Sequence, residues 1–230
     1  MKIAISQSNY LPWKGYFDLI QTVDEFIFFD EVQFTRRDWR NRNIIRNADN
    51  KKWLTIPIKS KGNYKEVISN IEVHKDNWKD SHLDLIKQCY SKSAHFDEMY
   101  SFFSECYSDL NTDRLSEINK TIIIKICKLF NFNTLFMDSK DINKSNIDIN
   151  ASERLLEICL SRKATIYTSG SAAKNYLDEK LFNKNGIEVE WFDYGNSKVY
   201  KQTFNDFYEN LSIVDCLMNC GKDKEKFLNY

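Results

Sequence analysis

Hydrophobic residues follow first a strand-like and then a helix-like pattern at the start of this chain. The apolar run Ile3-Ala4-Ile5 has the length and composition of a buried strand, and residues 25–30 form a second apolar run rich in Phe and Ile. Between them lie a polar, aromatic loop and apolar positions at helical spacing from Tyr16 to Val23. The order strand, loop, helix, strand predicts a βαβ unit, whose two strands are normally parallel.

Two hairpin-like strands and a helical region are predicted to follow. Residues 53–58 alternate like a strand, and residues 67–73 are expected to pair with them, which gives a small β insert near 53–75. Helical periodicity then predicts three helices in a row over residues 76–131, with Asp76 as the first N-cap.

Alternation of strands and helices resumes in the last third of the chain. Strands are predicted at 134–138, 164–169 and 187–192, and helices at 153–160 and 171–181. We therefore expect a single α/β domain over residues 1–230: a parallel-type sheet with flanking helices (HIGH-superfamily-like or Rossmann-like), the β insert and a helical layer near 76–131.

Polar residues at the ends of the predicted strands mark a candidate site. Ligands of open α/β sheets bind beyond the carboxyl ends of the strands, where Gln7 and Asp30 fall. Ser169, Gly170 and Ser171 lie between a predicted strand and a predicted helix. Small residues there allow a ligand to approach the backbone, and a helix N-terminus favours an anion, although an ordinary tight turn has the same composition.

Residues 31–52 are predicted to form a long polar loop or broken helix that is unusually rich in arginine. The guanidinium group matches phosphate or carboxylate through two parallel hydrogen bonds, so this segment is a candidate anion site. The alternative is a solvated face whose arginines pair with nearby acidic residues. The arginines are Arg36, Arg37, Arg40, Arg42 and Arg46.

Charge and composition limit the function classes. Lys plus Arg and Asp plus Glu both number 33, and the resulting net charge of zero argues against bulk nucleic-acid or membrane-surface binding. The chain shows no secretory leader and no run of about 18 apolar residues, so we expect a cytoplasmic protein without membrane insertion. Six cysteines without CxxC spacing do not indicate a metal site.

Few residues are candidates for acid–base chemistry. The sequence has no Walker loop, HExxH or GxSxG motif and only three histidines. The candidate catalytic residues are His82, whose unperturbed pKa near ~6.5 suits a base, and Asp30, which lies at the inferred cleft. Asp193 is a further carboxylate candidate. His82 falls on the apolar stripe of its helix, so it is equally a candidate core residue.

The loop Pro12-Trp13-Lys14-Gly15-Tyr16 resembles the first unit of the HIGH-motif nucleotidylyltransferases, in which a PxHxGH loop holds a triphosphate. The loop of this chain is one residue shorter and lacks both histidines, which argues against nucleotidyl transfer by that mechanism. A nucleotide-dependent activating enzyme remains an alternative function.

Seven segments spread over nearly the whole chain carry a resemblance to a known family: QSNYLPWKGYFDLI, DEVQF, WRNRN, WLTIPI, the helix from Trp78 to Tyr90, YTSGSAAKNYLD and LSIVDCLMNCG. In the same order and with similar spacing they recur in the WbqC-like family, which this chain resembles. The chain departs from the family at Ser8, where a Pro is usual. Members are typically encoded among genes for O-antigen and other surface-polysaccharide synthesis, and some carry a glycine-transferase label.

This resemblance implies a transferase of O-antigen or lipopolysaccharide biosynthesis that adds an acyl or aminoacyl group to a nucleotide-linked amino sugar. A non-catalytic nucleotide-sugar-binding subunit is the other alternative, and the oligomeric state is left open. No cofactor is implied beyond a nucleotide or an activated acyl donor. The expected substrate-binding residues are Gln7, Tyr10, Pro12, Gly15, Tyr16, Gln33, Arg36, Arg40, Arg42, Asn43, Ser169, Gly170 and Ser171.

Overall fold

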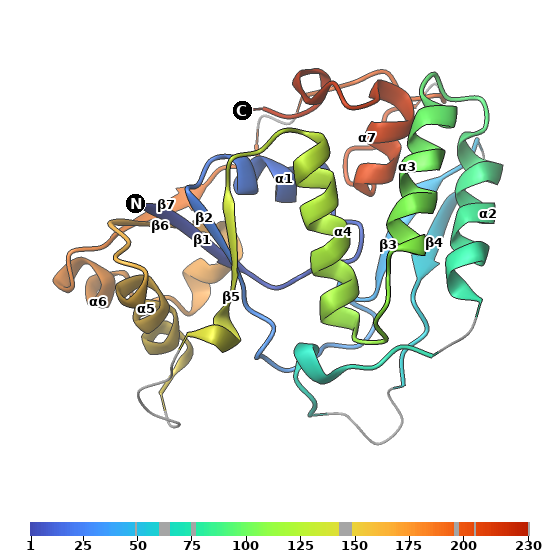
Figure 1. The fold of residues 1–230 in the computed structure, drawn as a ribbon. Helices are drawn as coiled ribbons and strands as arrows, with labels where there is room; N and C mark the ends of the chain where they lie inside the picture. The colour runs from blue at the N-terminus through green and yellow to red at the C-terminus, as the bar shows by residue number, and fades with distance from the viewer. Residues whose placement is uncertain are drawn as a thin grey trace.

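A parallel sheet lies at the centre of the fold (Figure 1). The computed structural model describes residues 1–48, 50–59, 65–74, 77–142, 149–195, 198–204 and 206–229. Within these residues the sheet has five strands in the order β5-β2-β1-β6-β7. The strands are β1 (Lys2–Ser6), β2 (Glu25–Phe28), β5 (Leu135–Asp138), β6 (Ile166–Gly170) and β7 (Glu188–Phe192).

The expected βαβ unit forms the middle of this sheet. β1 pairs in parallel with β2 and with β6, and α1 (Lys14–Gln21) connects the first two strands. Ile3, Ala4 and Ile5 are buried because helices cover both faces of the central strand, which explains the continuous apolar run. The α/β class and the parallel sheet expected from the sequence are confirmed.

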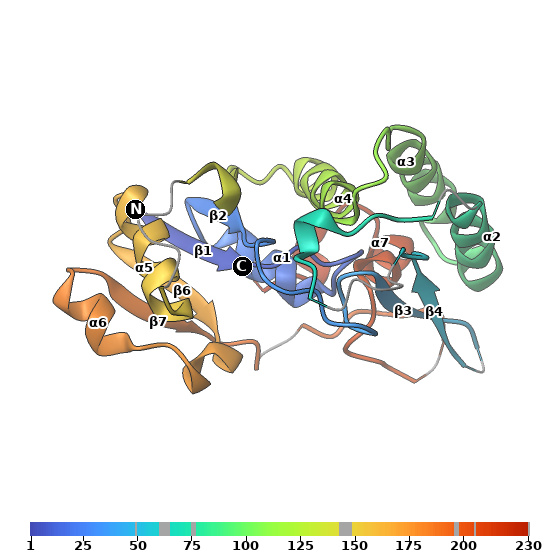
Figure 2. The same cartoon turned by 90° about the horizontal axis from the view of Figure 1, so that it is seen from below.

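Side chains of β2 alternate between two hydrophobic cores. Phe26 and Phe28 face the core that contains α1 and α4 (Leu115–Leu129), while Ile27 faces the core that contains α5 (Ala151–Ser161) and α6 (Glu179–Lys184). Figure 1 and Figure 2 accordingly place α5 and α6 on one side of the sheet and α1 and α4 on the other. The result is a three-layer α/β arrangement.

The helical layer beside the sheet matches the helices expected over 76–131. It consists of α2 (Trp78–Tyr90), α3 (Phe96–Ser108) and α4, and α7 (Ile213–Cys220) packs against α3. The expected N-cap Asp76 lies outside the described residues. The division into one domain with a β insert and a helical subdomain stays a prediction.

The predicted strand pairing in the insert is wrong. β4 (Lys51–Thr55) pairs antiparallel with β3 (Arg42–Arg46), inside the segment expected to be a loop or broken helix. Residues 67–73 instead contain the 3₁₀ turn Ile68–Asn70 and meet residues 53–58 through one bridge, Ile58 to Val73. Because arginines stand at both ends of β3, the segment lacks the apolar pattern of a strand, although its Ile45 is fully buried. The sequence also predicts a turn over residues 59–63, of which 60–63 lie outside the described residues.

The helix expected over 171–181 is also different. The 3₁₀ turn Ser171–Asn175 follows β6, and α6 begins only after Asp178, whose side chain accepts hydrogen bonds from the Lys180 and Leu181 amides. Because this Asp forms a strong N-cap, it starts the helix later than the apolar spacing suggested. The expected α-helix N-terminus next to Ser169 is therefore absent from this described segment.

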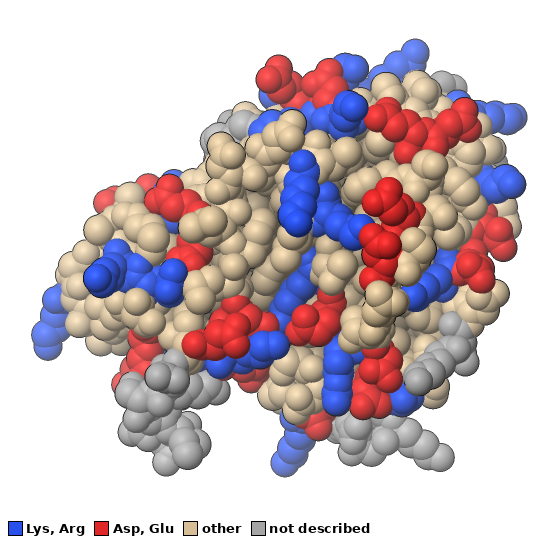
Figure 3. All heavy atoms as spheres, in the orientation of Figure 1, with Lys and Arg blue, Asp and Glu red and all other residues tan. Residues whose placement is uncertain are grey.

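Acidic and basic side chains are interspersed over the face of the molecule in Figure 3, as the balanced composition predicts. Among the described residues, none of the helices combines the length and the apolar character needed to cross a membrane.

Candidate functional site

A cavity of about 490 Å³ opens at the carboxyl ends of the sheet strands. Gln7 follows β1, Phe29 follows β2, and Ser169 and Gly170 end β6, and all four line this cavity. The strand-end rule therefore placed Gln7 and Ser169 together although 162 positions (169 − 7) separate them in the sequence.

The walls around Gln7 and Ser169 are held by tyrosines. The hydroxyl of Tyr16 donates to the Gln7 carbonyl oxygen at 2.9 Å, and that of Tyr167 donates to Ser169 Oγ at 3.3 Å. The Gln7 carboxamide has no hydrogen-bond partner among the described residues, so it is available to a ligand. A Cβ at Gly170 would lie 3.2 Å from the Tyr194 hydroxyl, so the glycine leaves room for this ring.

Arg40 is the one cationic side chain among the described residues that line the cavity. Its guanidinium pairs with Asp38 at 3.3 Å, and its backbone carbonyl accepts a hydrogen bond from Asn119 Nδ2 at 2.8 Å. The side chain is only 19% exposed, so solvent screens its charge weakly. Tyr176, Tyr194 and Phe29 add aromatic surface to the same cavity.

Asp30 is buried and does not line the cavity. Its Oδ1 accepts from the Ser8 amide at 2.8 Å, and its Oδ2 accepts from the Ser8 hydroxyl at 2.6 Å and from the Ser116 hydroxyl. Lys120 Nζ lies 3.9 Å from Oδ2. These donors occupy both carboxylate oxygens, so the geometry favours a role in tying β1, β2 and α4 together.

His82 lies in a buried polar chain outside the cavity. The Tyr107 and Tyr10 hydroxyls are hydrogen-bonded, the Tyr10 hydroxyl lies 2.8 Å from His82 Nδ1, and His82 Nε2 lies 3.2 Å from the Thr55 carbonyl oxygen. Burial lowers the pKa of His82 to about 4, against a smaller opposing effect of the Thr55 carbonyl. Both ring nitrogens are engaged, and the roles of His82 and Asp30 as bases stay predictions.

The other predicted site residues are spread over several places. Tyr10 is buried beside His82, and Tyr16 is buried beneath Gln7. Pro12 and Asn43 line a separate small pocket, and Ser171 lines a hollow next to the cavity. Gly15 lies under the Trp13 ring, which a Cβ at this position would overlap.

The predicted arginine cluster does not form as one group. Arg40 reaches the cavity, whereas Arg42 packs over the Trp53 ring at 4.0 Å and Arg46 packs over Tyr208 at 4.5 Å. Arg36 and Gln33 are exposed on the loop that precedes β3.

An adjoining hollow of about 440 Å³ shares Tyr194 with the cavity. Its lining includes Trp13, Lys174, Asp193 and Glu209. Asp193 was predicted from the sequence but Tyr194 was missed, although Tyr194 lies only two positions after the expected strand over 187–192. The same strand-end rule that found Gln7 would have found it.

A sequence model of the WbqC-like protein family matches residues 7–227. The chain belongs to this family. It is also 38% identical over 229 residues to "Uncharacterized protein Rv1507c" of Mycobacterium tuberculosis, an alignment that covers 100% of this chain and 98% of that protein. No solved structure matches the chain.

Membership in the WbqC-like family is consistent with a role related to polysaccharide biosynthesis. The matched range 7–227 contains all the residues that line the cavity except Ile5 and Ser6 of β1. The site at the sheet edge is thus built mostly from the part of the chain that the family model covers.

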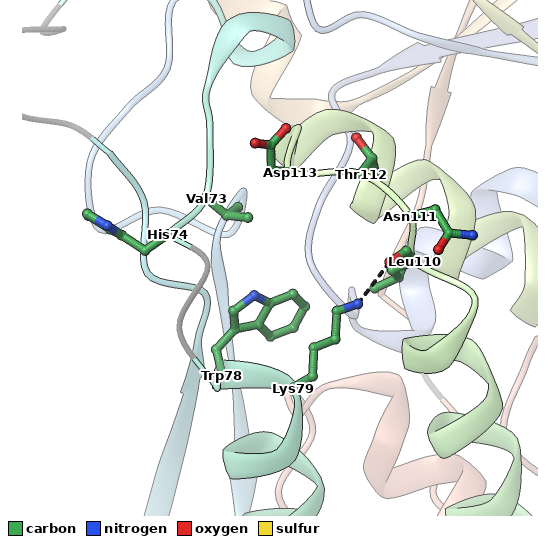
Figure 4. Close-up of a pocket in the computed structure, with 8 residues that line it drawn as sticks. All are labelled: Val73, His74, Trp78, Lys79, Leu110, Asn111, Thr112 and Asp113. Carbon is green, nitrogen blue, oxygen red and sulfur yellow. Dashed lines mark hydrogen bonds between the residues drawn. The ribbon is translucent and has the colours of Figure 1, made fainter.

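A second large hollow, about 510 Å³, lies at the start of α2 (Figure 4). Trp78, Lys79 and His74 border it, and Lys79 Nζ donates to the Leu110 carbonyl oxygen at 2.9 Å. None of the predicted site residues lines it, and it is not at the end of a parallel strand.

The described residues contain no group of three or more His, Cys, Asp or Glu side chains that could hold a metal ion. All six cysteines are buried and free, and burial raises the pKa of thiols such as Cys89 and Cys220 to about 11. These thiols are therefore protonated and poorly nucleophilic at neutral pH.

Proposed function

We propose that this WbqC-like protein is an enzyme of surface-polysaccharide (O-antigen-type) biosynthesis that transfers an acyl or aminoacyl group to the amine of a nucleotide-linked sugar. The observation that carries this proposal is the cavity beyond β1, β2 and β6, which combines one cation, an unpartnered carboxamide, small residues and tyrosine rings. Pockets that combine aromatic walls with a few polar groups are typical binding sites for small molecules.

Each part of the cavity suits one part of such a ligand. The Arg40 guanidinium can donate two parallel hydrogen bonds to the diphosphate. Tyr176 and Tyr194 offer ring surface to the base, and the Gln7 carboxamide can hydrogen-bond ribose or sugar hydroxyls.

The transfer requires a deprotonated amine. The amine nitrogen attacks the acyl carbonyl carbon, the new C–N bond forms, the bond from that carbon to its leaving group breaks, and the nitrogen loses a proton to a base. Asp193 and Glu209 are exposed carboxylates in the adjoining hollow and can receive that proton. His82 and Asp30 remain proposed bases, but each would have to give up internal hydrogen bonds.

A non-catalytic nucleotide-sugar-binding subunit is the second candidate function. The observation in its favour is that the described residues lining the main cavity include no carboxylate and no histidine. Such a protein would bind the same ligand without converting it.

The deciding experiment incubates the protein with UDP-glucosamine or dTDP-glucosamine and either glycyl or acetyl donors, and looks for the N-acylated sugar by mass spectrometry. We expect product from the parent protein, and an Asp193→Asn or Glu209→Gln variant that loses about 10²- to 10⁴-fold in rate but keeps affinity. Ligand binding without product from any pair would support the binding subunit instead.

A further inference from the structure

A small pocket of about 170 Å³ is lined in part by Trp13, which also lines the hollow next to the main cavity. Asn9, Pro12, Trp13, Trp39, Asn43 and Asn210 line it. The described lining residues thus include three carboxamides and two indoles and no charged side chain. This chemistry suits a neutral, hydroxyl-bearing ring and not a phosphate or a carboxylate.

Asn9 lines this pocket and carries a hydrogen-bond acceptor without a partner. Its Oδ1 is buried and has no partner among the described residues, whereas Asn43 Nδ2 donates to the Leu11 carbonyl oxygen at 2.8 Å and Asn43 Oδ1 accepts from the Ile44 amide at 2.7 Å. A buried acceptor without a donor is unfavourable, so rotation of the Asn9 carboxamide toward a ligand hydroxyl in the pocket would relieve the cost. Asn43 is held by the backbone, and Asn9 is the carboxamide left for a ligand.

The two indoles are held in place by other rings. Trp39 stacks on Trp53 with the ring centroids 5.9 Å apart, and Trp13 packs against Tyr194 at 5.3 Å. Trp39 nevertheless keeps 43% of its surface exposed. The pocket therefore offers fixed apolar ring surface, against which the C–H face of a sugar can pack with little loss of side-chain freedom.

The pocket borders the hollow that adjoins the main cavity. It shares Trp13 and Asn210 with this hollow, which in turn shares Tyr194 with the cavity. Its volume lies below the roughly 300 Å³ at which sites for drug-sized ligands begin, so it has room for one ring and not for a nucleotide.

We propose that the pocket of Asn9, Trp13 and Trp39 is the subsite that receives the sugar ring of the nucleotide-linked substrate. This inference rests on the proposed function and deepens it, because it separates recognition of the sugar from recognition of the nucleotide. In this arrangement the nucleotide occupies the cavity of Arg40 and the sugar amine faces the hollow of Asp193 and Glu209.

The test measures by calorimetry the affinity for two ligand pairs, UDP with UDP-glucosamine and dTDP with dTDP-glucosamine. The variants Asn9→Ala and Trp39→Ala should each weaken binding of the sugar-bearing member of the pair by about tenfold and leave the plain diphosphate unchanged. Arg40→Gln should weaken both members of the pair. Phe207→Ala is the control, because Phe207 is an aromatic residue with 37% exposure that lines neither this pocket nor the main cavity.

The variants are expected to fold. Asn9 Oδ1 has no internal partner to leave unpaired, and Trp39 is exposed, with Trp39→Phe as the milder replacement if the Ala variant melts early. If the Asn9 and Trp39 variants lose the same affinity for both members of a pair, or lose affinity for neither, the proposed subsite is wrong while the proposed function stands. If the parent protein binds no member of either pair, the subsite and the proposed function both fail.

Discussion

The Tyr10 hydroxyl lies 2.8 Å from Nδ1 of His82, whose other ring nitrogen faces the Thr55 carbonyl oxygen at 3.2 Å. Burial lowers the pKa of His82 to about 4, so the imidazole is neutral at pH 7. A carbonyl oxygen only accepts, so Nε2 of the neutral ring carries the proton and Nδ1 accepts from Tyr10. The Tyr107 hydroxyl then donates to Tyr10. This chain of hydrogen bonds anchors the loop that carries Asn9 to α2 and β4.

Stability should fall in mild acid because of His82. Burial lowers its pKa to about 4 from the ordinary histidine value of 6.5, so between these pH values the unfolded chain binds a proton that the folded chain does not. The contribution of His82 to the free energy of unfolding is fully present above pH ~6.5 and is lost as the pH falls to ~4. The total loss is about 3 kcal/mol. Urea unfolding at a series of pH values measures it.

The matched variant for this prediction is His82→Gln, because a glutamine can still donate to Thr55 and accept from Tyr10 without titrating. Its free energy of unfolding should change less between pH 6.5 and 4 than that of the parent, by the same about 3 kcal/mol. Parallel pH profiles for the two proteins would show that His82 protonates freely in the folded state.

Asp30→Asn should act on stability. The NH₂ of the new carboxamide would face either Lys120 or the Ser8 amide N–H, and both of these groups only donate. Leaving such buried groups unpaired costs about 3 kcal/mol, which denaturant unfolding would measure. A stable Asp30→Asn protein that binds ligand but has lost turnover would instead identify Asp30 as the base.

Gly15→Ala should destabilise the protein, although a Gly→Ala change in a helix normally stabilises a protein by up to about 1 kcal/mol. Here the added Cβ would overlap the Trp13 ring, so the indole must move, at a cost of about 1–3 kcal/mol. Thermal unfolding should show a lower midpoint, and because Trp13 lines the sugar pocket, affinity for UDP-glucosamine should also fall. A raised midpoint would mean that Trp13 does not pack over this helix start.

The sequence predicted those parts of the fold and site that depend on local pattern. The apolar run at Ile3 indicated the central strand because that strand is buried on both faces, and the strand-end rule brought Gln7 and Ser169 to one cavity. β3 was not predicted because its arginines pack through cation–π contacts and through their long aliphatic stems. An analysis of hydrophobic periodicity counts these residues as polar and therefore does not detect such packing.

The surroundings of the proposed bases could not be predicted in the same way. The hydroxyls that occupy Asp30 come from residues 22 and 86 positions away, and the partner of His82 Nδ1 comes from 72 positions away. Tertiary packing alone decides whether such a carboxylate or imidazole faces a ligand or another side chain. The 3₁₀ turn after Gly170 likewise depends on the cap formed by Asp178.

The most direct test of the central claim, that the sheet-edge cavity binds a nucleotide-linked sugar through Arg40, is a calorimetric titration with UDP-glucosamine and dTDP-glucosamine. We predict binding by the parent protein, about tenfold weaker binding by Arg40→Gln, and none by Ala172→Trp, which fills the cavity from an exposed position. Arg37→Gln, which removes the same charge from the same loop outside the cavity, should bind like the parent. Equal affinities for the parent, Arg40→Gln and Ala172→Trp would contradict the account.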